Sequence, residues 1–125
     1  MNTRTLLEIT SLSIAFGNKK RSTEVVHDIS FTISKNEIVG IVGESGSGKS
    51  VTALSIMGLL PKKTSLINGK IVFQGVNLLN EGPKKLRAIR GREIAMIFQE
   101  PMSSLNPSIK CGLQVSEILR LHLNY

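Results

Sequence analysis

The first part of the chain alternates apolar and polar residues, as half-exposed β-strands do. The alternation covers residues 6–9 and 12–16 and returns over residues 25–33. A period of two places successive side chains on opposite faces of a sheet. We therefore expect strands in these segments, separated by a polar loop over residues 17–24, GNKKRSTE.

Two short apolar runs predict strands of another kind. Residues 38–42 (IVGIV) and 93–98 (EIAMIF) show no alternation, which suits strands buried on both faces of a parallel sheet. Asn68-Gly69 predicts a turn ahead of a further strand over residues 70–73. Helical patterns occupy three other segments: 49–60, which Pro61 ends, 84–92 and 113–123. Strands that alternate with helices predict an α/β fold class.

The stretch GESGSGKS fits G-x-x-x-x-G-K-[ST], the phosphate-binding P-loop pattern. Glycines let the backbone wrap closely around an anion and aim several N–H groups at it. The lysine can reach the terminal phosphates as a point charge, and the last serine can offer its hydroxyl to Mg²⁺. The candidate nucleotide-binding residues are Gly43, Glu44, Ser45, Gly46, Ser47, Gly48, Lys49 and Ser50.

The alternative for this stretch is a chance glycine turn at the end of a strand. The predicted apolar strand before it and the predicted helix after it favour a P-loop. The loop alone does not select a class of protein, because kinases, GTPases, motors and transporter ATPases share it.

Three longer strings narrow the class. GESGSGKSVTALSIMGLLP, NGKIVFQGVNLL and IAMIFQEPMSSLNP closely resemble the ATP-binding subunits of ATP-binding cassette (ABC) transporters, in the branch that imports dipeptides, oligopeptides and nickel in bacteria. The resemblance covers essentially the whole chain, and IFQEPMSSLNP is its most specific string. It implies that residues 1–125 are the N-terminal part of an ABC-type P-loop NTPase domain: an antiparallel β subdomain, the P-loop and the start of the helical subdomain.

The resemblance also implies ATP and Mg²⁺ as cofactors and assigns two more site residues. Gln99 matches the Q-loop glutamine, which touches the metal and the attacking water, so Ser50 and Gln99 are the candidate metal ligands. The loop from Glu100 to about Gly112 would face the membrane-embedded permease. Phe16 matches the aromatic residue that stacks on adenine, although a plain core position in a strand is the alternative.

Catalysis by this chain alone stays open. In the family, two subunits enclose two ATP molecules beneath the permease, at the cytoplasmic face of the bacterial inner membrane. This sequence contains no LSGGQ-type signature motif, no strand ending in Asp-Glu and no switch histidine motif, so no carboxylate is assigned to activate water. We expect little or no hydrolysis by the chain alone. The alternatives are a catalytically inactive remnant that acts as an interaction module and, less well supported, a small P-loop kinase or nucleic-acid ATPase.

Charge and composition change this interpretation little. The formal charge is +7, and five basic residues fall within residues 84–92, without the interleaved aromatic residues that stack on bases. A solvated helix face is therefore expected there, and no nucleic acid. No apolar run reaches the roughly 20 residues that span a bilayer, so membrane association is expected only through the permease.

The single cysteine and the two histidines are expected to have structural and not chemical roles. Cys111 is the only cysteine, which fits a reducing compartment and a packing role. His27 and His122 have no ligand partners at metal-binding spacing and are expected to be ordinary histidines.

Because the apolar strands 38–42 and 93–98 would lack their usual neighbours, we expect the isolated chain to be marginally stable or oligomeric.

Overall fold

A long β-hairpin begins the structure. The computed structural model describes residues 4–123 and places β1 at Thr5–Asn18 and β2 at Arg21–Ser34, paired antiparallel. The Asn18 side chain accepts hydrogen bonds from the backbone N–H groups of Lys20 (3.0 Å) and Arg21 (2.8 Å) and so closes the turn. The strands predicted from the alternation are confirmed, but the predicted polar loop is too long, since both strands run into it.

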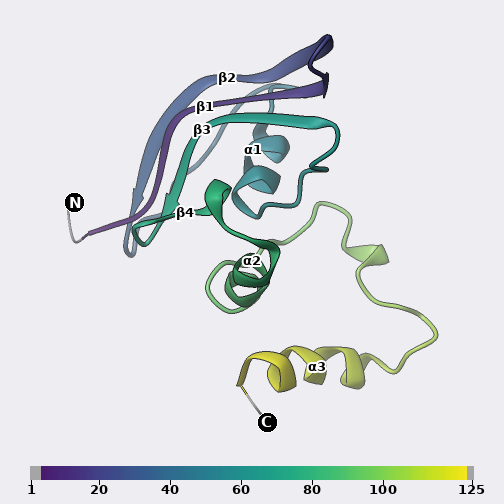
Figure 1. Ribbon diagram of the computed structural model, residues 1–125. Coiled ribbons are helices and arrows are strands. Elements are labelled where there is room, and N and C mark those ends of the chain that lie inside the picture. Colours follow the sequence, from purple (N-terminus) through teal and green to yellow (C-terminus); the bar gives the residue numbers. More distant parts are fainter. Residues whose placement is uncertain (1–3, 124–125) are drawn as a thin grey trace. The chain divides into compact units, whose positions relative to one another are not determined.

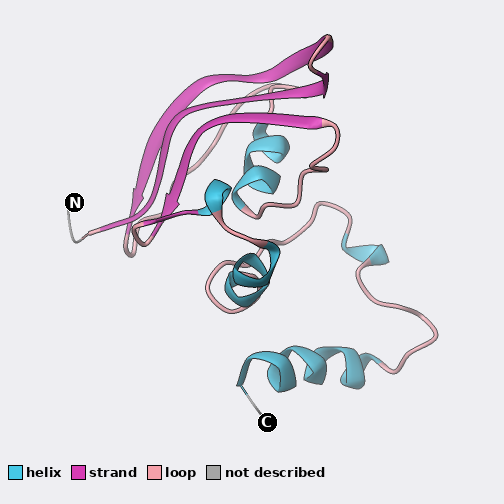
Figure 2. Ribbon diagram, in the orientation of Figure 1, coloured by secondary structure: helices cyan, strands magenta, loops and turns pink. Residues whose placement is uncertain are grey.

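The hairpin is half of a four-stranded sheet with the order β2-β1-β3-β4, all of it antiparallel. β3 spans Ser65–Phe73 and β4 spans Val76–Asn77, followed by a 3-10 turn, η1, at Leu78–Asn80. The sheet curves around helix α1, Lys49–Ile56, which lies on its concave side (Figures 1 and 2). The predicted N-terminal antiparallel β subdomain is confirmed.

Two bulges keep the apolar side chains of the hairpin on the face that α1 covers. Ser11 in β1 and Asp28 in β2 have φ values of 46° and 42°, and the strand register shifts beside them. The backbone N–H of Ser11 donates to the Ser30 hydroxyl (2.8 Å), and that of Asp28 donates to the Ser13 hydroxyl (2.9 Å). One extra residue per strand reverses the alternation, so both halves of each strand contribute to one core.

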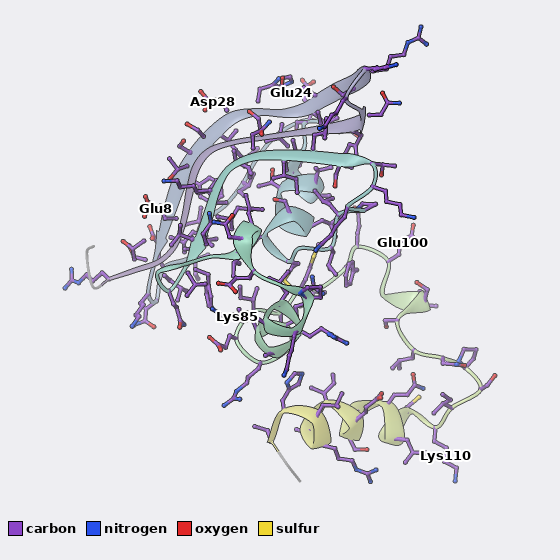
Figure 3. All side chains as sticks on the ribbon, viewed as in Figure 1. Glu8, Glu24, Asp28, Lys85, Glu100 and Lys110 are labelled. Atoms are coloured by element: carbon purple, nitrogen blue, oxygen red, sulfur yellow. The ribbon has the colours of Figure 1, made fainter. Side chains whose placement is uncertain are left out.

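The core lies between this face of the sheet and α1 with the segment after it. Its buried apolar residues in this part of the chain are Leu7, Ile9, Leu12, Ile14, Val26, Met57, Leu60, Ile71, Phe73 and Leu78. The opposite face is polar: in Figure 3, Glu8, Glu24 and Asp28 lie along the side of the sheet away from α1. Burial on one face only is why these strands show a period of two.

Three predictions of local structure are wrong. Residues 38–42 form no strand, and Ile38 and Val42 are 100% and 97% exposed. Residues 93–98 contribute only a single bridge between Ile94 and Arg90. A strand needs a hydrogen-bonded neighbour, and neither run has a ladder partner among residues 4–123.

The third error concerns Asn68-Gly69, which lies inside β3 and is not a turn. Gly69 has a φ of +100°, and a Cβ there would lie 2.4 Å from the backbone oxygen of Ser11. The glycine is therefore the close-packed partner of the Ser11 bulge on the neighbouring strand. Glycine within a strand often marks such a close backbone approach.

The chain divides into two compact units, Met1–Gly82 and Pro83–Tyr125. The second unit contains α2 (Pro83–Ile89), a 3-10 turn η2 (Pro101–Ser103) and α3 (Cys111–Leu123). Both helices were predicted from the sequence. Cys111 is exposed, so the predicted packing role is wrong for the described part of the chain. None of the helices between residues 4 and 123 combines the length and the apolar character that crossing a bilayer requires.

Candidate functional site

The P-loop sequence forms a tight connection that leads into α1. The helix begins at Lys49, and Gly48 is its N-cap residue with a φ of 88°. Gly46 also has a positive φ, of 80°. Both values lie in the left-handed region that residues with a Cβ rarely adopt, so the two glycines permit the backbone path that the sequence predicted.

The Lys49 ammonium group is bound to the loop that precedes it. Its Nζ donates hydrogen bonds to the backbone oxygens of Gly43 (2.5 Å) and Glu44 (2.6 Å) and to the Ser47 hydroxyl (3.0 Å). The Glu44 oxygen also accepts the backbone N–H of Ser47 at 3.2 Å. The cation therefore lies within the curve of the loop, where it can serve both the loop oxygens and an anion placed against them.

Gly48 joins the loop to the β-sheet. A Cβ at this position would lie 2.7 Å from the Val25 backbone oxygen and 2.8 Å from Cγ2 of Val26, both on β2. The Gly48 oxygen accepts two hydrogen bonds from Thr52, one from the backbone N–H and one from the hydroxyl, each at 2.8 Å. Only glycine allows this approach of the helix start to the strand.

Thr52 was missed as a site residue in the sequence. It is 3% exposed, and its hydroxyl fixes the carbonyl of the glycine that precedes the P-loop lysine. The available signal was its position four residues after Gly48, where a threonine hydroxyl can reach the carbonyl of the preceding helical turn. Ser55 is 1% exposed and makes a related bond, in which its hydroxyl donates to the Thr52 oxygen three residues earlier at 2.6 Å.

A cavity of about 360 Å³ adjoins the loop on its β2 side. Ser47, Gly48, Lys49 and Thr52 line it from the loop and α1. Apolar side chains form most of the remaining wall: Val25, Val26, Ile29, Phe31, Ile41 and Val42. The space thus combines a cation and hydroxyl groups at one side with an apolar surface at the other, which is a composition common in small-molecule sites.

Phe16 lies elsewhere on the same unit. It pairs with Thr23 on β2 and Ser65 on β3, is half-buried, and is not among the residues that line this cavity. Its assignment to an adenine base therefore stays a prediction. The core alternative is not supported, because Phe16 is half-buried and is not one of the buried core residues.

The other predicted site residues are accessible. Glu44, Ser45, Ser47 and Ser50 are all exposed on the loop and the first turn of α1. Gln99 is an exposed residue at a bend in the second unit of the chain. The structure brings the eight P-loop residues together within the first unit, and the role of Gln99 stays a prediction.

The loop fits a phosphate-bearing ligand with Mg²⁺. A glycine-rich turn that opens a helix presents backbone N–H groups and the positive end of the helix dipole to an anion. Lys49 supplies a full positive charge, and Ser50 supplies an exposed hydroxyl of the kind that Mg²⁺ accepts. The arrangement is that of a P-loop nucleotide-binding protein.

Comparison with known families agrees with this class. The family model described as ABC transporter matches residues 26–118. This range includes the whole P-loop and Gln99 and exceeds half of the chain. The chain belongs to the ABC transporter family. Nucleotide binding is a property that this family implies.

Individual relatives are similar over nearly the whole chain. The peptidoglycan transport ATP-binding protein YejF of Agrobacterium fabrum is 49% identical over 122 residues, which is 97% of this chain and 22% of that protein. A protein of Escherichia coli named as a probable D,D-dipeptide transport ATP-binding protein is 45% identical over 121 residues, 96% of this chain and 37% of its own length. The chain thus spans only 22% to 37% of the length of these curated relatives.

A solved structure agrees with the fold. An Atm1-family ABC exporter from a bacterium, determined with ATP bound, is similar with a TM-score of 0.53 and 27% sequence identity. The similarity covers 73% of this chain and 15% of the exporter chain. The predicted ABC-type P-loop fold class is confirmed.

Proposed function

We propose that the chain is the nucleotide-binding part of an ABC importer subunit that takes up peptides or nickel. The P-loop from Gly43 to Ser50 would hold the phosphates of Mg-ATP, and Ser50 and Gln99 would contribute to the metal site. The names of the relatives, which refer to peptidoglycan and D,D-dipeptide transport, support the peptide branch.

The observation that carries this proposal is the position of Lys49. Its ammonium group is already held inside the loop by three oxygen atoms. A preorganised cation loses little side-chain entropy when a phosphate arrives, so the loop can bind an anion without first ordering itself. Backbone N–H groups and the start of α1 then add to the attraction.

Partners and location follow from the same proposal. The loop from Glu100 to about Gly112 would contact transmembrane permease subunits, and a second ATP-binding subunit would complete the nucleotide sandwich. The chain would then work at the cytoplasmic face of the bacterial inner membrane, without nucleic acid and without direct membrane contact. ATP turnover belongs to this assembly, and the chain alone is expected to bind nucleotide with little or no hydrolysis.

The test is a titration of the purified chain with a fluorescent ATP analogue in the presence of Mg²⁺. Lys49→Ala removes the cation that would bind the terminal phosphates and should weaken binding by at least about 100-fold, since charge-assisted bonds to phosphate are worth roughly 1.5–3 kcal/mol each. Lys62→Ala removes an exposed charge of the same unit outside the loop and should leave the affinity unchanged. Equal nucleotide affinity in the Lys49→Ala variant and the parent chain would refute the proposal.

An interaction module without turnover is the second candidate. The exposure of large apolar residues in the second unit favours it, with Ile97 and Met102 both 95% exposed. Such side chains commonly mark surfaces that bind another protein. If the folded parent chain binds permease but no nucleotide, this candidate is favoured over the first.

A further inference from the structure

One side chain ties the loop before α3 to the helix itself. Gln114 lies in the first turns of α3 and is half-buried. Its Oε1 accepts a hydrogen bond from the backbone N–H of Asn106 at 2.8 Å. Its Nε2 donates to the backbone oxygens of Asn106 (2.9 Å) and Ile109 (2.8 Å). The side-chain amide thus pairs with Asn106 as another peptide group would in an antiparallel ladder.

This arrangement permits only one orientation of the amide. Exchanging the oxygen and nitrogen of Gln114 would place an NH₂ group against the Asn106 N–H and an oxygen against two carbonyl oxygens. The rest of Asn106 is engaged as well, because its Oδ1 accepts the Ser108 N–H (2.9 Å) and its carbonyl accepts the Ile109 N–H (3.2 Å). Pro107, which follows Asn106, has a fixed φ and restricts Asn106 to extended backbone.

We propose that Gln114 is a positioning residue that makes residues 106–110 and the start of α3 one rigid contact element. The inference rests on the proposed function, in which the loop from Glu100 to about Gly112 faces the permease. Leu105, Ile109 and Leu113 are 45%, 46% and 54% exposed and lie within or beside the clamped segment. Fixing their backbone in advance removes the ordering entropy that a flexible loop would lose on binding.

The first test measures hydrogen–deuterium exchange of the backbone amides of residues 102–110. Gln114→Leu removes all three hydrogen bonds and should speed exchange at the Asn106 amide by at least about 10-fold, because each bond contributes roughly 0.5–1.5 kcal/mol. Ser116→Ala removes a hydroxyl that donates to the Leu113 oxygen within α3, at 3.0 Å, and serves as the matched control. Unchanged exchange in Gln114→Leu, or an equal increase in Ser116→Ala, would overturn the proposal.

A conservative variant tests the donor role separately. At about pH 7.5 the carboxylate of Gln114→Glu can still accept from the Asn106 N–H but cannot donate to the two carbonyl oxygens, so exchange at the Asn106 amide should lie between that of Gln114→Leu and that of the parent chain. At about pH 5 the facing carbonyl oxygens favour the protonated acid, which regains one donor and should bring exchange at the Asn106 amide closer to that of the parent chain at the same pH. Absence of this pH-dependent rescue would mean that the amide donors do not hold the loop.

The functional readout uses the chain in its complete subunit, assembled with permease in vesicles. Gln114→Leu should lower the permease-stimulated kcat about 10-fold while leaving the KM for ATP unchanged, because the P-loop does not involve this residue. Equal stimulation in variant and parent would refute the positioning role. Slow exchange at the Asn106 amide in a parent chain that binds no nucleotide would instead refute the proposed function. The hydrogen bonds between Gln114 and residues 106–109 would still stand.

Discussion

The contact between Gly48 and β2 leads to a prediction that isolates one feature of the P-loop. Gly46 and Gly48 have similar positive φ values, 80° and 88°, but different surroundings. A Cβ at Gly46 would meet no atom within 4 Å, whereas at Gly48 it would lie 2.7 Å from the Val25 oxygen and 2.8 Å from Val26 Cγ2. Alanine at either position therefore carries the same backbone strain, and only alanine at Gly48 also clashes.

The expected magnitudes follow from these two terms. A left-handed conformation costs a residue with a Cβ about 1–2 kcal/mol, so Gly46→Ala should lower the free energy of unfolding by that amount. Overpacking costs roughly 1–3 kcal/mol, so Gly48→Ala should lower the free energy of unfolding by that amount more than Gly46→Ala does. The difference corresponds to a shift of about 1 M in the urea midpoint.

The assay is urea denaturation followed by circular dichroism, with exchange of the Thr52 amide as a local probe. The Thr52 N–H donates to the Gly48 oxygen at 2.8 Å, so displacement of Gly48 should speed its exchange. In a double-mutant cycle, Val26→Ala should partly relieve Gly48→Ala, because it removes Cγ2 and leaves the Val25 oxygen in place. Equal destabilisation by the two glycine variants would refute the reasoning and place the helix start away from β2.

Four further outcomes are expected. Thr52→Val should cost about 1 kcal/mol in unfolding experiments, because the buried hydroxyl that holds the Gly48 oxygen is lost while the side-chain volume is kept. Ile14→Ala should cost about 2–5 kcal/mol in the same experiment, since Ile14 is 0% exposed; a loss below 1 kcal/mol would contradict its place in the core. Phe16→Ala should weaken ATP binding about 10-fold and leave tripolyphosphate binding unchanged in calorimetry if the ring stacks on the base, whereas an equal loss for both would favour a structural role. Replacing Ile38 and Ile97, which are 100% and 95% exposed, by lysine should reduce self-association of the isolated chain in analytical ultracentrifugation; unchanged association would contradict the view that unpaired apolar segments cause it.

Much of the candidate site could be predicted from the sequence because its determinants are local. The glycine spacing and the lysine of the P-loop specify a turn and a helix start within eight residues, and α1 begins at the predicted Lys49. The hairpin strands were predicted from a period of two that one buried face imposes. Gln114 could not be predicted from the sequence. Its partner segment begins eight residues away, and the hydrogen bonds that join them produce no periodic pattern.

The sequence by itself determined the P-loop, the strands of the hairpin and the presence of the three helices, since each depends on neighbouring residues. The end of α1 was predicted less well, because the helix stops at Ile56 and not at Pro61. Only the tertiary structure decided which apolar runs are paired: β1 is extended because β2 and β3 supply its hydrogen bonds, whereas residues 38–42 have no such neighbour in the described chain. It also decided that Gly69 lies within a strand, opposite the Ser11 bulge, and that Gly48 packs against β2. Backbone pairing and close approach involve residues distant in sequence, and a local pattern therefore cannot specify them.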